Sequence, residues 1–366
     1  MSVITLILVE RDNIANSILV HTPLPAPPQG GLQLRIDSFG LTTNNVTYAA
    51  LGNAYKAFPV DNLSSKLTPS HSPRYFDFFP VDASVPDAAR YGTIPVWGLA
   101  TGFFPLASHI VLVPGAELTD AFFDVDRPQL PAGHMIYNKV SGGVPNLHDP
   151  FHSPTHEPHM LLLRPLFFTS YLLADKLIDE KLYTAKTVVI TSASSKTSLC
   201  LAFVLKRAGI PTIGLTSASS IAWLADTNAY TELLPYDALG SAPPPGDVVL
   251  VDVAGNQAVV ADVGRWAGEG LKKELSVGMT HWESRAKVGA GSAEVFFAPA
   301  QLNKKQAEMG VLALGAVMGK AFAETLGSAD EWVEVERVEG EEGVLRVWRE
   351  LVAGKAAPRK GLVLTL

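Results

Sequence analysis

The stretch Ala185–Lys206, AKTVVITSASSKTSLCLAFVLK, decides the fold. It predicts a short buried strand, a turn of small hydroxyl residues, and a helix that packs on the strand. The free N–H groups in the first turn of a helix point at whatever lies there, and the helix dipole favours a phosphate at that end. The sequence therefore predicts a nucleotide-binding turn.

The turn lacks the glycines of the dinucleotide fingerprint G-x-G-x-x-G. In their place stand Ser192, Ala193, Ser194, Ser195, Lys196 and Thr197. Serine hydroxyls and one lysine can hold a phosphate, so we assign the four hydroxyl residues and Lys196 to the cofactor site. The alternative is a polar cap, because Ser and Thr satisfy the first N–H groups of a helix without a ligand. The spacing of a P-loop is absent, which argues against an ATPase.

A chain of 366 residues, of which 47% are hydrophobic, suits two globular domains. The net charge of -7 argues against a nucleic-acid partner, which would require clustered Lys and Arg. Cys200 is the only cysteine, which excludes disulfides within the chain and cysteine-based zinc sites. We expect Cys200 to be a small buried core residue in a reducing compartment.

Two apolar segments bear on the presence of a signal peptide or a membrane span. The N-terminal run MSVITLILVERDN is too short for a signal and ends in charges, so it predicts a first strand. The run Met160–Leu173 is interrupted by Arg164, Pro165 and Thr169, and it falls short of the roughly eighteen apolar residues of a span. We expect a soluble, cytoplasmic protein with no membrane partner.

The pattern of strands and helices changes along the chain. Residues 31–137 carry short β-rich runs between Pro, Gly, Asn and Asp, which is typical of a small barrel or bent sheet. Residues 141–159 predict a long surface connection or lid. Beyond them, TVVITS, IPTIGLTS, DVVLVDVAG and ELSVGMT alternate with helical segments, and one helix is expected from Asn303 through EMGVLALGAVMGKAFAETLG. Apolar strands that alternate with helices indicate a doubly wound parallel sheet.

Several stretches together resemble the medium-chain dehydrogenase/reductase superfamily, especially its zinc-free quinone and enoyl reductases. They are GGLQLRIDSFGLTTNNVTYAALGN, TVVITSASSKTSLCLAF, VVLVDVAGN and ELVAGKAAPRKGLVLTL. More narrowly, YGTIPVWGLAT, LLLRPLFFTSYLLAD and VGMTHWE resemble an uncharacterised, domain-of-unknown-function branch of that superfamily. The passage around Thr101 and Gly102 is shorter than the family pattern, as if a strand and a turn were missing.

The resemblance implies an α/β fold, with a Rossmann-like doubly wound parallel sheet plus a smaller β-rich, GroES-like barrel domain. We expect residues 1–160, with residues 318–366 returning to them, to form the β-rich catalytic-type domain. Residues 161–317 are expected to form the nucleotide-binding domain. Reductases of this class are often dimers, so the resemblance also allows a homodimer.

The second strand of the predicted sheet ends at Thr216 and Ser217, where an NAD enzyme carries an acidic residue for the ribose hydroxyls. Small hydroxyl residues there leave room for a 2′-phosphate, so we expect NADP (NADPH) as the cofactor. No Arg or Lys follows closely to pair that phosphate. A serine-capped helix is the alternative.

Residues after the next two strands are expected on the nicotinamide side, since ligands of open α/β sheets lie outside the carboxyl ends of the strands. They are Ala254 and Gly255 after one strand, and Gly278, Thr280, His281 and Trp282 after the other. Trp282 can stack on a flat ring and His281 can donate a proton. The alternative is that His281 and Trp282 cap a domain interface.

Asn44, Asn45, Tyr48 and Tyr55 lie where, by the resemblance, the zinc-free reductases place active-site polar residues. A tyrosine hydroxyl can give a proton to the enolate that forms after hydride addition to an unsaturated carbonyl. Asn45, Tyr48 and Tyr55 are therefore candidate catalytic residues. The alternative is a half-buried tyrosine that packs in a barrel with one hydrogen bond.

Four histidines, His148, His152, His156 and His159, lie in one segment. Prolines separate them, and no helix is expected to hold two ligands on one face, as zinc sites commonly require. We therefore expect a solvated loop and no metal site.

Together these observations predict a zinc-free oxidoreductase that uses NADPH to deliver hydride to the conjugated carbonyl of a small apolar substrate. Two rivals remain. One is a cofactor-independent isomerase or dehydratase of biosynthesis on the same fold, and the other is a non-catalytic binding module, for which the altered turn is the main argument.

Overall fold

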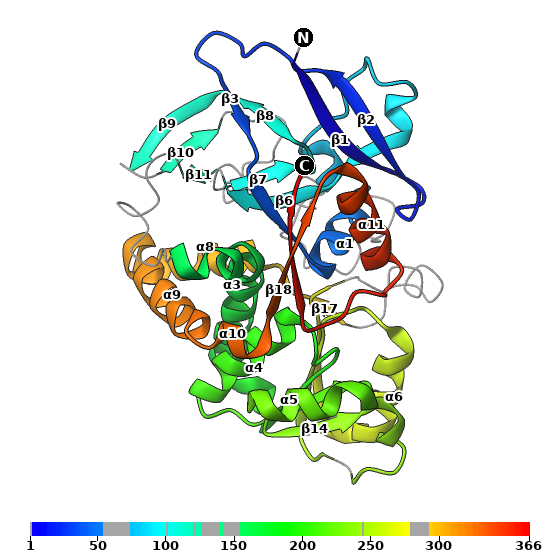
Figure 1. Ribbon diagram of the computed structural model, residues 1–366. Helices are drawn as coiled ribbons and strands as arrows, with labels where there is room; N and C mark the ends of the chain where they lie inside the picture. Colours follow the sequence, from blue (N-terminus) through cyan, green and yellow to red (C-terminus); the bar gives the residue numbers. More distant parts are fainter. Residues whose placement is uncertain are drawn as a thin grey trace. The chain divides into compact units, whose positions relative to one another are not determined.

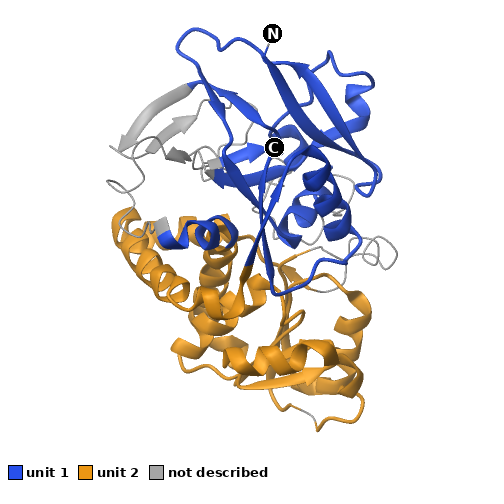
Figure 2. Cartoon of the chain, in the orientation of Figure 1, with its two compact units in different colours: residues 1–162, 335–366 blue, residues 163–334 orange. Residues whose placement is uncertain are grey.

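The computed structural model describes residues 2–53, 74–99, 102–119, 122–125, 139–141, 154–243, 245–278 and 293–366. The chain forms two compact units (Figure 2). Unit 1 comprises residues 1–162 and 335–366, and unit 2 comprises residues 163–334. Unit 1 is thus built from two segments that are distant in sequence, with unit 2 inserted between them.

Unit 2 contains a six-stranded parallel sheet in the order β14-β13-β12-β15-β16-β17. Figure 1 labels β14 and β17, the two edge strands of this sheet. Its strands are β12 (Thr187–Ile190), β13 (Thr212–Thr216), β14 (Glu232–Pro235), β15 (Val248–Asp252), β16 (Leu271–Ser276) and β17 (Glu294–Val295). Numbered from β12, this is the order 3-2-1-4-5-6 of the Rossmann fold. The expected doubly wound parallel sheet is therefore confirmed.

The helices associated with unit 2 are α3 (Glu157–Asp179), α4 (Lys196–Arg207), α5 (Ile221–Thr227), α6 (Gln257–Ala267), α8 (Ala298–Met309), α9 (Val311–Leu326) and α10 (Ala329–Trp332). The central strands β13 and β15 are buried along their whole length. Val189, Leu215 and Leu250 pack in one core cluster with Val263 of α6. Each such side chain contributes roughly 1.5–3 kcal/mol when it is fully buried, so the strands that carry the site are anchored in the core.

Two expectations for the helical parts were wrong. The predicted single helix from Asn303 is two helices, α8 and α9, bent by 119° at Gly310, whose φ of +86° ends the first helix. The return to unit 1 also lies later than residue 318, because Phe322 of α9 stacks on Phe167 and Trp332 of α10 stacks on Phe203, inside unit 2.

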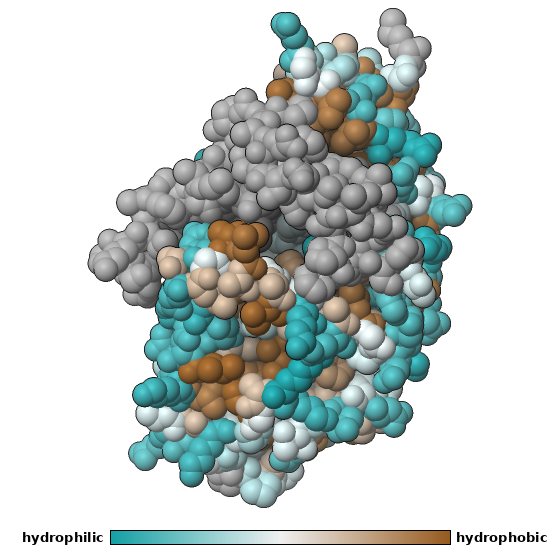
Figure 3. All heavy atoms as spheres, turned by 90° about the vertical axis from the view of Figure 1, so that its left-hand side faces the viewer, coloured by the Kyte–Doolittle hydropathy of each residue, from teal (hydrophilic) through white to brown (hydrophobic). Residues whose placement is uncertain are grey.

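The expected surface connection 141–159 is only partly described, because residues 142–153 lie outside the described ranges. Its last residues differ from the expectation, since Pro154–His156 form a 3-10 turn and α3 begins at Glu157. Within the described part of the chain, no single helix has both the length and the hydropathy to cross a bilayer. Figure 3 views the molecule from the side on which α9 lies in Figure 1. The residues Val311, Leu312 and Val317 of this helix are exposed.

Unit 1 is β-rich. Its larger sheet has the order β18-β19-β4-β6-β7, and its smaller sheets are β2-β1-β5, β11-β10-β9 and β3-β8. The strands are β1 (Val3–Glu10), β2 (Ser17–Pro23), β3 (Leu32–Arg35), β4 (Ser38–Leu41), β5 (Tyr91–Thr93), β6 (Pro95–Leu99), β7 (Gly102–Pro105), β8 (His109–Leu112), β9 (Pro114–Thr119), β10 (Phe122–Val125), β11 (Lys139–Ser141), β18 (Glu334–Glu339) and β19 (Lys360–Thr365). Its helices are α1 (Thr43–Ala50) and α11 (Glu341–Val352).

The shortened passage near Thr101 does not interrupt the larger sheet of unit 1. β6 and β7 pair directly as an antiparallel hairpin, with Trp97 opposite Phe103 and Gly98 opposite Gly102. β4 pairs with β6 on one edge and with β19 on the other. The sheet is therefore continuous from β18 to β7.

Candidate functional site

The candidate site is at the carboxyl ends of β12 and β15, where the strand order of the sheet reverses. The Thr191 hydroxyl, just after β12, donates to Asp252 Oδ1 at 3.0 Å and accepts from the Val253 N–H at 3.0 Å. The same carboxylate oxygen accepts from the N–H groups of Ala254 (3.3 Å) and Gly255 (3.1 Å). This buried network ties the two strand ends together at the point where ligands of open α/β sheets bind.

The turn after β12 is held by backbone hydrogen bonds to residues far along the chain. Ser192 has a φ of +50°, and its N–H donates to the Tyr236 hydroxyl at 2.8 Å. The Ala193 N–H donates to the Leu215 carbonyl at 2.9 Å, and the Ala193 carbonyl accepts from the Tyr230 hydroxyl at 2.8 Å. The backbone of Ser192 and Ala193 is thus occupied by protein partners.

Ser195 is the N-cap of α4. Its Oγ accepts from the Ser198 N–H at 3.1 Å, and its hydroxyl donates to Ser198 Oγ at 2.8 Å. The Ser198 hydroxyl in turn donates to the Thr191 carbonyl at 3.0 Å, where it is fully buried between helix and strand. For Ser195 the capping role is therefore present, and Ser198 and Thr191 are structural residues of the turn that the sequence reading did not select.

Two residues of the turn have hydrogen-bond donors that the described part of the protein does not use. Among the described residues, the backbone N–H groups of Ser194 and Thr197 and the hydroxyl of Ser194 have no hydrogen-bond acceptor. Both residues are half-buried, so a ligand can reach them. Unoccupied N–H groups at a helix N-terminus are the donors that bind phosphates in nucleotide sites.

Lys196 is the first residue of α4 and belongs to the same turn. Its side chain is half-buried. Burial lowers the pKa of Lys196 from its ordinary value of 10.5 to about 8. An anion bound beside it would counteract that loss of hydration, since an opposite charge favours the ammonium form.

The two hydroxyl residues at the end of β13 differ in accessibility. Thr216 is buried, whereas Ser217 is exposed and lies 3.1 Å from Ser219 and 3.2 Å from Ser220, oxygen to oxygen. Only Ser217 of this pair offers its side chain to a ligand. The residues that follow it, up to Asn228, include neither Lys nor Arg.

Ala254 and Gly255 follow β15, as expected, and Gly255 has a φ of +77°. Their N–H groups donate to Asp252, so they shape the turn. Gly278 follows β16. Thr280, His281 and Trp282 lie outside the described residues.

In unit 1, Asn45 belongs to the capping box of α1. Its Oδ1 accepts from the Thr42 N–H at 2.8 Å, and its Nδ2 donates to the Pro95 carbonyl at 2.9 Å. Both ends of the amide are thus used in a buried structural role, and we do not retain Asn45 as a catalytic candidate. Asn44 is the neighbouring residue of the same helix, and Tyr55 lies outside the described residues.

Tyr48 of α1 is buried in an aromatic cluster with Tyr75, Phe78 and Phe103. Its hydroxyl accepts from Trp97 Nε1 at 3.2 Å. Burial raises the pKa of Tyr48, against hydrogen bonds from Trp97 and Asn44. The hydroxyl therefore keeps its proton near neutral pH, which is the state that a proton donor needs.

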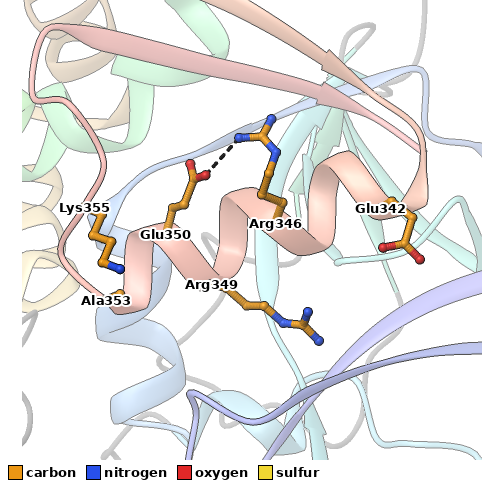
Figure 4. A pocket seen from close by; sticks show the side chains of 6 residues that line it. All are labelled: Glu342, Arg346, Arg349, Glu350, Ala353 and Lys355. Carbon is orange, nitrogen blue, oxygen red and sulfur yellow. Dashed lines mark hydrogen bonds and ion pairs between the residues drawn. The ribbon is translucent and has the colours of Figure 1, made fainter.

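A separate pocket of about 360 Å³ lies along α11 (Figure 4). Three of its charged groups have protein partners: Arg346 pairs with Glu350 at 3.0 Å, and Arg349 donates to Ser17. Pairing of this kind leaves little net attraction for a charged ligand. We therefore keep the turn of unit 2 as the candidate site.

The histidine segment is only partly described. His156 ends the 3-10 turn before α3 and His159 is in the first turn of α3, with ring centroids 6.4 Å apart, and His148 and His152 are outside the described ranges. Within those ranges, no three His, Cys, Asp or Glu side chains come together as metal ligands would. Cys200 is fully buried in α4, as expected, and burial raises its pKa to about 12.

A family model described as "Protein of unknown function (DUF2855)" matches residues 39–357. No curated protein matches the sequence. Among solved structures, CurA from Vibrio vulnificus in complex with NADPH is similar, with a TM-score of 0.57, 13% identity, and coverage of 100% of this chain and 99% of that one. The yhdH oxidoreductase from Salmonella enterica in complex with NADP has a TM-score of 0.54 and 13% identity, over 99% of both chains.

The quinone oxidoreductase from Coxiella burnetii has a TM-score of 0.50 and 16% identity, over 100% of both chains. At such low identity these similarities establish the fold and nothing finer. They confirm the expected fold class, a Rossmann-like domain with a smaller β-rich, GroES-like domain.

Proposed function

The chain belongs to the DUF2855 family, whose description assigns no activity, and we propose that it is an NADPH-dependent reductase of small apolar carbonyl compounds. One observation carries the proposal. At the switch point of a Rossmann-ordered sheet, the N-terminus of α4 keeps the N–H groups of Ser194 and Thr197 available beside Lys196. A dinucleotide pyrophosphate has the charge and the acceptors that these groups require.

In this proposal some residues of the turn contact the ligand and others hold the turn in place. Ser194 and Thr197 donate to the pyrophosphate through backbone and hydroxyl groups, and Lys196 supplies a positive charge. Ser192, Ser195 and Ser198 hold the turn in place by the hydrogen bonds described above. The hydroxyl residues thus serve both the structure and the ligand.

The preference for NADPH over NADH rests on the end of β13. A carboxylate there would repel a 2′-phosphate, and this chain has the exposed Ser217 with Ser219 and Ser220 beside it. Hydroxyl groups can donate to the phosphate oxygens. Thr216, which the sequence also suggested, is buried, so we assign the contact to Ser217.

Bound NADPH supplies the hydride, and the protein supplies orientation and a proton. Tyr48 is the described candidate for the proton donor, because its hydroxyl stays protonated among aromatic side chains that suit an apolar substrate. Tyr55 and His281 remain candidates for the same role. We propose a conjugated carbonyl as the substrate and a mechanism without zinc.

The proposal is tested by titrating the purified protein with NADPH, NADP and NADH while following ligand fluorescence and the melting temperature. We expect NADPH to bind about tenfold more tightly than NADH. The variant Ser217→Asp should reverse this order, because it places a negative charge beside the 2′-phosphate. Enones and quinones should then accelerate NADPH oxidation, and the corresponding saturated ketones should not.

The matched control is Ser241→Asp, which adds the same charge at an exposed serine of unit 2 and should leave the preference unchanged. An unchanged preference in Ser217→Asp would remove Ser217 from the site. If none of NADPH, NADP and NADH binds, the proposed reductase function is excluded. The polar-cap alternative, in a protein that kept the fold and lost the nucleotide, would then be favoured.

A further inference from the structure

Ser192 adopts a backbone conformation that its residue type does not favour. Its φ is +50°, in the left-handed region that glycine occupies freely and that residues with a Cβ rarely adopt. The dinucleotide fingerprint uses glycine for this kind of tight turn. Some other feature of the fold must therefore hold Ser192 in place.

Two tyrosine hydroxyls contact the backbone of the turn on successive residues. Tyr236, in the 3-10 turn after β14, accepts from the Ser192 N–H at 2.8 Å. Tyr230, which precedes β14, donates to the Ala193 carbonyl at 2.8 Å. One bond fixes the donor and the other fixes the acceptor of the strained segment, so together they restrain its rotation.

The space for Tyr230 is created by a glycine in the neighbouring strand. A Cβ on Gly214 of β13 would lie 2.7 Å from Cδ1 of Tyr230 and 2.9 Å from Cβ of Ala193, closer than a Cβ approaches non-bonded carbon atoms in folded proteins. Gly214 therefore lets the Tyr230 ring pass beneath the turn, where it is buried. Burial raises the pKa of Tyr230 well above its ordinary value, so the donating proton stays on the oxygen.

We propose that Tyr230 and Tyr236 are positioning residues that replace the conformational role of glycine in the nucleotide turn. They hold Ser192 and Ala193 so that the N–H groups of Ser194 and Thr197 face an anionic ligand. The inference rests on the proposed function for its ligand, and on the two hydrogen bonds and the φ of Ser192 for its structural part.

The experiment is a double-mutant cycle between the tyrosine hydroxyls and the strained residue, with NADPH as the probe. Tyr236→Phe and Tyr230→Phe each remove one hydroxyl and keep the ring, so the core survives. We expect each to weaken NADPH binding by roughly tenfold, since a buried backbone group loses its partner. In a Ser192→Gly background, which accepts a positive φ without help, the loss on adding Tyr236→Phe should shrink to about threefold or less.

The control is Tyr171→Phe, which removes a hydroxyl of a half-buried tyrosine in α3 that makes no hydrogen bond to the turn. It should leave the affinity unchanged. Equal losses from Tyr236→Phe in the wild-type and Ser192→Gly backgrounds would overturn the proposal, because the hydroxyl would then act by another route. Unchanged affinity in both tyrosine variants would overturn it as well.

The same cycle is measured without ligand, which separates this inference from the proposed function. If the wild-type protein binds no NADPH, the reductase proposal fails, and the positioning role is judged from melting temperatures alone. Tyr236→Phe should lower the melting temperature by a few degrees in the parent and by less than half as much beside Ser192→Gly. Additive decreases in melting temperature would refute the positioning role.

Discussion

Lys196 gives the nucleotide site a dependence on pH. Its pKa of about 8 in the ligand-free protein means that the ammonium loses its proton near pH 8. A bound pyrophosphate favours the protonated form and raises this pKa, so binding takes up a proton above pH 8. We expect NADPH affinity to be constant from about pH 6.5 to 7.5 and to fall by roughly three- to tenfold for each pH unit above 8.

The measurement is the dissociation constant of NADPH between about pH 6.5 and 10 by fluorescence titration. Lys196→Arg keeps its charge throughout and should remove the decline. Lys196→Met should bind more weakly at neutral pH and also lack the decline. A decline of the same size in Lys196→Met would show that another group is responsible.

NADPH affinity is expected to fall above pH 8, whereas the contribution of Lys196 to the free energy of unfolding of the ligand-free protein should rise. The folded protein releases the Lys196 proton near pH 8, whereas the unfolded chain holds it up to the ordinary pKa of 10.5. The unfolded state therefore binds more protons between these values, and the contribution of Lys196 makes the free energy of unfolding rise with pH. Binding of the nucleotide thus favours the protonated form of Lys196, whereas folding without ligand favours the deprotonated form.

The contrast between Ser195 and Tyr236 shows how far a sequence can predict single residues of this site. Ser195 and Lys196 could be selected because strand, turn and helix are consecutive in the chain. Tyr230 and Tyr236 lie 37 and 44 residues from the groups that they contact. Nothing local distinguishes these tyrosines from others in loops, since the pairing depends on the order of the strands in the sheet. A positive φ at a serine is likewise invisible in the sequence.

At the scale of elements, the turn that leads into β12 is strained. Lys181, Leu182, Tyr183 and Thr184 have φ values of 49°, 51°, 50° and 72°, all left-handed. Such a conformation costs residues with a Cβ about 1–2 kcal/mol each. We expect Lys181→Gly and Thr184→Gly, at the two exposed positions, each to raise the free energy of unfolding by about 0.5–1 kcal/mol.

The measurement is urea or thermal unfolding. Lys186→Gly is the matched control, because Lys186 is exposed and close in sequence but has an ordinary φ. It should lower the free energy of unfolding by about 0.5–1 kcal/mol through the greater freedom of the unfolded chain. If Thr184→Gly lowers the free energy of unfolding as much as Lys186→Gly does, the backbone at Thr184 is not strained.

Elements were predictable where burial makes their pattern continuous. TVVITS, IPTIGLTS and DVVLVDVAG predict β12, β13 and β15 because central strands are apolar on both faces. β14, ELLP, is a short edge strand with polar and half-buried residues and was missed. The bend at Gly310 was missed because residues that favour helices stand on both sides of it, and one glycine is tolerated inside many helices.

At the scale of the whole molecule, the composition bears on metal content. The chain has one cysteine, which is fully buried. A tightly bound zinc normally requires three or four Cys, His or acidic ligands in tetrahedral geometry. We expect purified protein to contain far less than one equivalent of zinc by elemental analysis.

The control for this measurement is the same protein dialysed against a chelator, whose zinc content and melting temperature should not change. Zinc near one equivalent that survives dialysis would contradict the expectation. In that case the histidine segment would be the first candidate. His148→Ala with His152→Ala should then release the metal.

The two-unit architecture was predictable in outline because the helical alternation starts abruptly after residue 161 and the resemblance covers nearly the whole chain. The place where the chain returns to unit 1 was not predictable to the same accuracy. It depends on Phe322 and Trp332, which pack on aromatic side chains of α3 and α4 more than a hundred residues earlier. Sequence patterns are read within short windows of the chain, so they do not predict contacts between residues more than a hundred positions apart.

The pairing of β4 with β19 has a consequence for the protein while it is being made. β4 is synthesised early and its residues are all buried in the finished fold, yet the strand that covers one of its edges comes after the whole of unit 2. At typical translation rates this delay is on the order of tens of seconds. During that time a ribosome-bound chain carries an uncovered strand edge, whose unpaired N–H and C=O groups can pair with a strand of another chain. Unit 2, whose segment is continuous, can fold within that interval.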